Sequence, residues 1–199
     1  MSRSYRMAKR AEAQEETRER IVRATMALHL EQGVATTSYT DVAERAGVGA
    51  ATVYRHFPTM GSLVEACGAH VWRMIEPPRP EDAEARFIGL RSRTARIERL
   101  ARELDAFYAR GAVPLWGAEQ DRERLPELDA FLRRVDEGVA ALVAAALGGD
   151  VSEPTMRIAR AVAHFTVWRA LAQAEAEPQK RIRVMAAMIE AAVTRAAGE

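Results

Sequence analysis

The stretch from Ser38 to Phe57, SYTDVAERAGVGAATVYRHF, constrains the fold more than any other part of the chain. Ser38 and Asp41 stand three residues apart, which is the spacing of a capping box at the start of a helix. Gly47 follows a short apolar face, and glycine readily takes the left-handed conformation in which a chain leaves a helix and turns. The helical period then resumes over residues 49–57. The stretch therefore predicts two short helices with a sharp corner between them.

The second of these helices has a composition typical of a DNA reader. Val53 and Phe57 face inward, and the opposite face is small or polar. A major groove admits one α-helix, which must bring such residues close to base edges and phosphates. We expect base-edge contacts from Ala50, Ala51 and Thr52, and phosphate contacts from Ser38, Thr40, Tyr54, Arg55 and His56. Taken alone, the stretch also fits an ordinary helical hairpin whose glycine merely ends a helix.

Residues on both sides of this stretch extend the pattern. The chain resembles the tetracycline-repressor (TetR) family of transcriptional regulators from Thr17 to Leu63. The matching residues are Thr17-Arg18-Glu19-Arg20-Ile21, Gly33, Ser38, Asp41-Val42-Ala43, Ala46-Gly47-Val48, Thr52-Val53-Tyr54, Phe57-Pro58 and Leu63. The resemblance implies an all-α fold, with an N-terminal three-helix helix-turn-helix DNA-binding domain and a C-terminal helical domain for ligand binding and dimerisation. It also implies a homodimer that binds a palindromic DNA operator, most simply as a repressor, and is released by a small-molecule effector.

Four positions depart from the family pattern. Met60 stands where a lysine is usual, which removes one expected phosphate contact. Gly61 stands where a helix former is usual, and Gly49 replaces the usual Ser or Thr cap, a change that costs only a few tenths of a kcal/mol. His29 replaces an aromatic residue, and we expect it to pack or cap, since no second metal ligand lies at a suitable spacing.

Composition limits the class of protein. Of 199 residues, 48% are hydrophobic and 6% aromatic, and the net charge is only +1, so any DNA affinity must come from a local basic patch. The lone Cys67 excludes an internal disulfide and a four-cysteine zinc site; it suits a buried position, with a redox-sensing thiol as the alternative. No apolar run approaches the ~18 residues of a membrane span, and no secretory signal is recognisable, so we expect a cytoplasmic protein.

We divide the chain into a segment that contains a basic N-terminal arm and the start of the first helix (residues 1–16), a helix-turn-helix domain (17–62) and a helical effector-binding and dimerisation domain (63–199). The arm carries Arg6, Lys9 and Arg10, and is expected to be either a strand-like or disordered extension that binds DNA or a solvated tail. Periodicity predicts helices at about 17–32, 60–75, 94–108, 126–147, 154–174 and 178–197, and a loop at 111–117 that contains Pro114.

The last two predicted helices are apolar on most sides and need to be covered on most sides. A twofold partner is the economical cover, although a central position within a monomer would serve as well. The predicted dimer interface is Ala159, Ala163, Val167, Ala170, Met188 and Ala191.

By resemblance, the C-terminal domain should hold an effector pocket, and such pockets are mostly apolar and aromatic. The candidate lining residues are Trp72, Phe107, Tyr108, Trp116, Phe131, His164 and Trp168. We found no catalytic set, no cofactor motif and no metal-binding spacing, and therefore expect no enzyme, no cofactor and no metal. A helical adaptor or small-molecule-binding protein without DNA-binding activity is the competing hypothesis.

Overall fold

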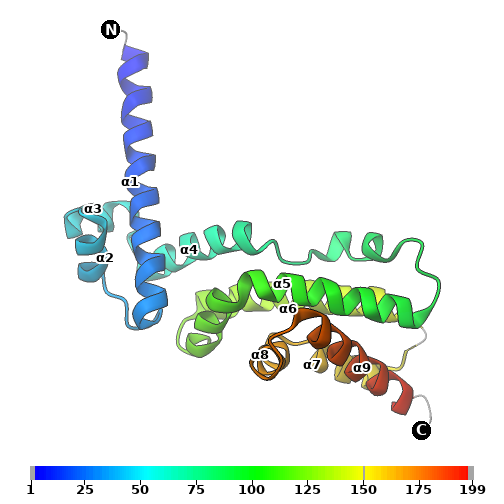
Figure 1. Cartoon of the computed structure of the whole chain (residues 1–199). Helices are drawn as coiled ribbons and strands as arrows, with labels where there is room; N and C mark the ends of the chain where they lie inside the picture. Colours follow the sequence, from blue (N-terminus) through cyan, green and yellow to red (C-terminus); the bar gives the residue numbers. More distant parts are fainter. Residues whose placement is uncertain (1–2, 150, 197–199) are drawn as a thin grey trace. The chain divides into compact units, whose positions relative to one another are not determined.

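The computed structural model describes the backbone of residues 3–149 and 151–196, and every regular element in these ranges is a helix (Figure 1). The α-helices are α1 (Arg3–Gln32), α2 (Tyr39–Ala46), α3 (Ala50–His56), α4 (Met60–Ile75), α5 (Arg93–Asp121), α6 (Pro126–Leu147), α7 (Glu153–Val162), α8 (Phe165–Ala174) and α9 (Pro178–Ala196). Two short 3₁₀ helices, Pro80–Asp82 and Glu84–Phe87, lie between α4 and α5. The predicted all-α fold is confirmed, and α4, α6 and α9 follow their predicted ranges.

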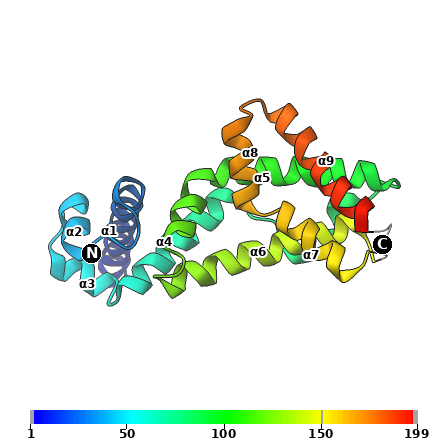
Figure 2. The same cartoon turned by 90° about the horizontal axis from the view of Figure 1, so that it is seen from below.

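Two compact units divide the chain. Unit 1 contains the chain up to Val71 together with Trp116–Phe131, and unit 2 contains Trp72–Leu115 and the chain from Leu132 onward. In unit 2, α9 packs along α7 and also meets α8 (Figure 2). The predicted functional boundary between residues 62 and 63 stays a prediction, because compactness alone does not define a functional domain.

In unit 1, helix α2 begins and ends at the residues that the sequence predicts. The Asp41 amide donates to Ser38 Oγ at 3.2 Å and the Ser38 amide donates to Asp41 Oδ2 at 3.0 Å, so the predicted capping box at the start of α2 is present. Gly47 ends α2 with φ 64°, in the left-handed region. Val42 and Val53, from the two helices, are fully buried in a common core with Ile21 of α1.

The N-terminal arm is helical, which corrects the expectation of a strand-like or disordered extension. Helix α1 begins at Arg3 and runs without a break to Gln32. Residues 3–16 contain neither Gly nor Pro and are rich in Ala, Arg, Glu and Gln, which have high helix propensity. In Figure 1 this part of α1 extends beyond α2 and α3, and the side chains of residues 5–16 are exposed.

The predicted loop at 111–117 is wrong, because α5 continues through Pro114 to Asp121. A proline inside a helix costs about 3 kcal/mol, and here the burial of Leu115 and Ala118 offsets that cost. Leu115 is fully buried, and an added Cβ at Gly111 would lie only 2.8 Å from Leu115 Cδ1. Glycine at 111 therefore lets the leucine fold back against its own helix.

The predicted single helix at 154–174 is also wrong, because the chain breaks between α7 and α8. His164 caps α8, and its Nδ1 accepts from the Thr166 amide at 3.3 Å. The buried Tyr108 hydroxyl donates to the Ala163 carbonyl oxygen at 2.9 Å, which satisfies a backbone group that the break leaves without a helical partner. Both interactions stabilise the break.

Candidate nucleic-acid interface

Helix α3 presents a small and polar face. Ala50, Ala51, Tyr54 and Arg55 are exposed, whereas Val53 on the opposite side is fully buried. The residues predicted to approach base edges and the residues predicted to hold phosphates therefore project from one accessible surface. This arrangement is what a helix needs if its apolar side packs on a domain and its polar side enters a major groove.

Tyr54 is held in place by a residue that the sequence did not indicate. The rings of Tyr39 and Tyr54 stack with their centroids 4.1 Å apart and their planes 23° apart. The Tyr39 hydroxyl donates to the Phe57 carbonyl oxygen at 2.8 Å, and partial burial and the Tyr54 hydroxyl raise the pKa of Tyr39, so it stays a donor. Tyr39 thus ties α2 to the end of α3 and limits the directions in which the Tyr54 hydroxyl can point.

The two predicted phosphate ligands at the start of α2, Ser38 and Thr40, differ in their surroundings. The Ser38 hydroxyl donates to Asp41 Oδ2 at 2.7 Å, and this bond and that of the Ser38 amide hold the pKa of the Asp41 carboxyl below its ordinary value. The hydroxyl hydrogen of Ser38 is therefore engaged in the cap. Thr40 lies in the first turn of α2 with its side chain exposed.

A groove of about 490 Å³ lies between α1 and α3. It is lined by Arg10, Ala13, Gln14, Thr17, Arg20, Val48, Gly49, Thr52, Arg55 and His56. Of the predicted residues, the groove brings together Arg10, Thr52, Arg55 and His56. Arg6 and Lys9 are exposed on α1 but are not among its lining residues.

Positive charge dominates this groove. Arg10, Arg20 and Arg55 line it, and none of its described lining residues is acidic. Partial burial lowers the pKa of His56, and the nearby charges of Arg55 and Arg18 lower it further, against a smaller opposing effect of Glu15. The surroundings of His56 are thus electropositive, and the site suits an anion. The sequence missed Gln14, Thr17 and Arg20, although their spacing to Arg10 is helical.

Three residues of the predicted effector pocket belong to a buried aromatic cluster in unit 2. Phe107, Tyr108 and Trp168 are each at least 96% buried and pack with Phe165, with the Tyr108 ring centroid 5.6 Å from that of Trp168. The Trp168 indole nitrogen donates to Asp105 Oδ1 at 2.8 Å. These contacts give the three side chains a packing role in this structure.

The other four predicted pocket residues are divided between the two units. In unit 2, the Trp72 ring lies 4.1 Å beneath the guanidinium carbon of Arg134, and His164 Nε2 lies 3.6 Å from a carboxylate oxygen of Asp136. Trp116 and Phe131 belong to unit 1, where Phe131 lies beside Gly68. An effector site lined by the predicted set stays a prediction.

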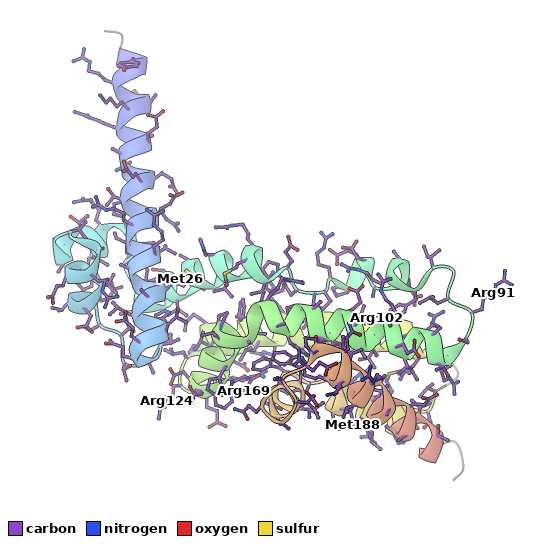
Figure 3. All side chains as sticks on the ribbon, viewed as in Figure 1. Met26, Arg91, Arg102, Arg124, Arg169 and Met188 are labelled. Carbon is purple, nitrogen blue, oxygen red and sulfur yellow. The ribbon has the colours of Figure 1, made fainter. Side chains whose placement is uncertain are left out.

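The six residues of the predicted dimer interface differ in how far they are buried within the single chain. Ala159 and Ala163 have no exposed surface, so other parts of the same chain already cover them. Ala170 and Ala191 are exposed, and Met188, labelled on α9 in Figure 3, is 36% exposed. Val167 is half-buried. The predicted interface stays a prediction.

Cys67 has the environment of a packing residue. It is buried in the core of unit 1, and burial raises the pKa of its thiol to about 12. A protonated, inaccessible thiol is a poor redox sensor. Elsewhere, the described residues include no group of three or more His, Cys, Asp or Glu side chains arranged to hold a metal. No helix in the described part of the chain could cross a membrane.

Comparisons with known proteins agree with this geometry. Residues 21–67 match the family described as bacterial regulatory proteins, tetR family. Over 166 residues the chain is 28% identical to the HTH-type transcriptional repressor Rv3405c of Mycobacterium tuberculosis, a match that covers 76% of this chain and 81% of that protein.

Two solved structures are similar in fold. Salmonella enterica GusR is 20% identical, with a TM-score of 0.59 over 90% of this chain and 96% of that chain. The TetR-like regulator LfrR from Mycobacterium smegmatis, solved in complex with proflavine, is 21% identical, with a TM-score of 0.54 over 91% and 98% of the respective chains.

Proposed function

We propose, because this chain belongs to the tetR family of bacterial regulatory proteins, that it represses transcription by binding an operator in double-stranded DNA. The observation that carries the proposal is the face of α3, where Ala50, Ala51, Tyr54 and Arg55 are exposed and Val53 is buried behind them. The two alanines permit close approach to base edges in the major groove. Tyr54 and Arg55 donate to phosphate oxygens, which position the helix without reading sequence.

The repressor acts as a homodimer on a roughly palindromic operator. Two copies of α3 then occupy successive half-sites, separated by about one turn of DNA, roughly 34–36 Å, or somewhat more. Support comes from large apolar side chains left exposed on α7 and α9, where Ile158 is 50%, Val184 43% and Met188 36% exposed. A second copy would remove these side chains from water.

A small-molecule effector bound in the helical domain, residues 63–199, releases the operator. The effector favours a dimer in which the two copies of α3 no longer match the spacing of the half-sites. It must bind that state better than the DNA-bound state, since equal affinity for both would shift nothing. The complex of LfrR with proflavine supports this part of the proposal by similarity. A regulator of this kind acts in the cytoplasm and needs no catalytic activity.

Fluorescence anisotropy with DNA fragments flanking the protein's own gene tests the proposal. Tyr54→Ala and Arg55→Ala should lower affinity by a similar factor on operator and unrelated DNA, and should flatten the salt dependence. Arg91→Ala, which removes an exposed arginine from the loop before α5, is the control and should bind as the wild type does. Unchanged binding in both α3 variants would show that this face of α3 does not contact DNA. A wild-type protein without salt-sensitive DNA binding would favour the helical adaptor.

A second experiment separates docking from dimerisation. Ala51→Phe should abolish operator binding, because a bulky side chain at this exposed position keeps α3 from seating in the groove. Sedimentation should still detect the dimer, since Ala51 belongs to unit 1 and the proposed interface to unit 2. Full operator affinity in this variant would contradict the docking.

A further inference from the structure

We propose that α1 is a second DNA-contacting helix, whose basic face and α3 together hold the sugar-phosphate backbone of one DNA strand in the groove between them. The inference rests on the proposed DNA-binding function and goes beyond it. It assigns DNA contacts to Gln14, Thr17 and Arg20, and it makes α1 a rigid element of the interface.

The residues of α1 that line the groove form one face of the helix. At about 100° per residue, positions 10, 13, 14, 17 and 20 fall within an arc of about 120°. Arg6 falls within the same arc, so the face continues from the groove toward the N-terminus. The continuous helix from Arg3 to Gln32 is what aligns these residues.

The acidic residues of α1 lie on other faces. Glu12, Glu15, Glu16 and Glu19 all lie outside the arc that lines the groove, by the same angular rule, and of these four only Glu15 is near enough to His56 to raise its pKa. In the linear sequence these glutamates lie close to the basic residues of the arm, but the helix places the acidic and the basic side chains on different faces. The face toward the groove therefore carries Arg10 and Arg20 without an acid between them.

The groove suits a phosphodiester backbone better than a protein segment. Its basic residues come from both walls, Arg10 and Arg20 from α1 and Arg55 from α3, while Gln14 and Thr52 add uncharged hydrogen-bonding groups. Guanidinium groups match phosphate oxygens in geometry as well as charge. A strand contacted by α3 through Arg55 is at the same time beside α1, because both helices line one groove.

The exposed part of α1 extends this surface beyond α3. The seven residues from Arg3 to Lys9, which precede the groove-lining residues of α1, span about 10 Å at 1.5 Å per residue. Residues 5–16 are exposed, and no other part of unit 1 covers them in Figures 1 and 3. DNA carries one phosphate about every 3.4 Å along each strand. The extension is thus long enough to meet several phosphates outside the half-site that α3 reads.

Matched arginine substitutions on α1 test the assignment. Arg10→Ala and Arg20→Ala should each lower affinity roughly tenfold on operator and unrelated DNA, and should each reduce the slope of log affinity against log salt by about one. Arg23→Ala is the control, because Arg23 is an exposed arginine of the same helix that lies outside the groove face and pairs with Glu19. Unchanged salt slopes for both groove variants, or an equal loss for Arg23→Ala, would overturn the proposal.

A proline at residue 11 tests whether the helix, and not the charge alone, is needed. Ala11→Pro interrupts α1 at an exposed position outside unit 1's core, so the domain should keep its thermal midpoint. It should weaken DNA binding as much as the double substitution Arg6→Ala and Arg10→Ala. Wild-type affinity for Ala11→Pro together with weak binding by Arg10→Ala would assign the contacts to a flexible arm and would overturn the proposal.

The outcomes also separate this inference from the proposed function. If wild-type protein shows no salt-sensitive DNA binding, the proposed function itself fails. If it binds and only the Tyr54 and Arg55 variants are weakened, α3 is the reader and α1 takes no part. Weakening by both the α3 and the groove-facing α1 variants, with Arg23→Ala unaffected, supports both.

Discussion

Asp121 offers the sharpest test of how unit 1 is held together. It is the last residue of α5 and is 93% buried. Its Oδ2 accepts from the Val34 and Ala35 amides, each at 3.0 Å, and its Oδ1 accepts from Arg124 Nη1 at 3.2 Å. One carboxylate therefore caps the turn that leads from α1 to α2. The end of α5 fixes a connection that is far away in the sequence.

The contacts set the size of the effect of Asp121→Ala. Removing the carboxylate leaves the buried Val34 amide and the half-buried Ala35 amide without their acceptor. An unsatisfied buried donor costs about 1–3 kcal/mol. With water partly able to reach Ala35, the expected loss in free energy of unfolding is about 2–5 kcal/mol in total. Asp121→Asn keeps an acceptor oxygen and should lose about half as much.

Urea unfolding and amide hydrogen exchange measure the two parts of this prediction. The control is Glu19→Ala, which removes a carboxylate of unit 1 that is 59% exposed and should change stability by less than about 0.5 kcal/mol. In Asp121→Ala, exchange of the Val34 and Ala35 amides should accelerate more than exchange in the interior of α4. Equal stability of the Asp121→Ala and Glu19→Ala proteins, with unchanged exchange at Val34, would refute the reasoning.

Three further predictions concern buried groups. Asp105→Ala should lower the free energy of unfolding, measured in urea, by about 3–5 kcal/mol, because Arg181, whose Nε donates to Asp105 at 2.6 Å, would stay buried without a carboxylate partner. Adding Arg181→Met should restore part of the loss. Burial lowers the pKa of His29 from 6.5 to about 4. As pH falls, this imidazole is therefore protonated in the unfolded chain before it is protonated in the folded one. Stability should fall by up to about 3 kcal/mol as pH falls from 6.5 toward 4, and His29→Phe should flatten that part of the pH profile measured by urea unfolding. Cys67 should react with a thiol reagent only as fast as the protein opens, so its rate should rise steeply with urea, whereas fast reaction in buffer alone would contradict its burial.

The parts of the fold that the sequence predicted correctly are those with local causes. The capping box of Ser38 and Asp41 and the left-handed Gly47 each act within a few residues, so their spacing alone gives α2 and the corner after it. The parts that it missed depend on distant contacts. Pro114 stays helical because Leu115 is buried, and the chain breaks after Ala163 where Tyr108 bonds its carbonyl.

The candidate site shows the same division. Periodicity within a single helix correctly predicted that Ala50, Ala51 and Arg55 are exposed and that Val53 is buried, whereas Thr52 and His56, also predicted to face outward, are half-buried. It could not predict the Tyr39–Tyr54 stack, since no pattern shows that the two rings would meet. Nor could it predict the groove, because Arg20 and Arg55 lie on different helices and are 35 positions apart in the chain. The linear order of the charges in the arm does not show which of them share a face, because a helix places acidic and basic side chains on different faces.

That sorting explains how a chain with a net charge of +1 can bind a polyanion. Balanced charge gives no long-range attraction, and at physiological salt a charge is screened within about 8 Å. Under the proposed docking, binding then depends on contacts made inside the groove, where Arg10, Arg20 and Arg55 would meet phosphates at close range and no lining residue is acidic. The slope of log affinity against log salt should therefore reflect the number of phosphate contacts that the faces of α1 and α3 make. Charge changes on other surfaces should leave that slope unchanged.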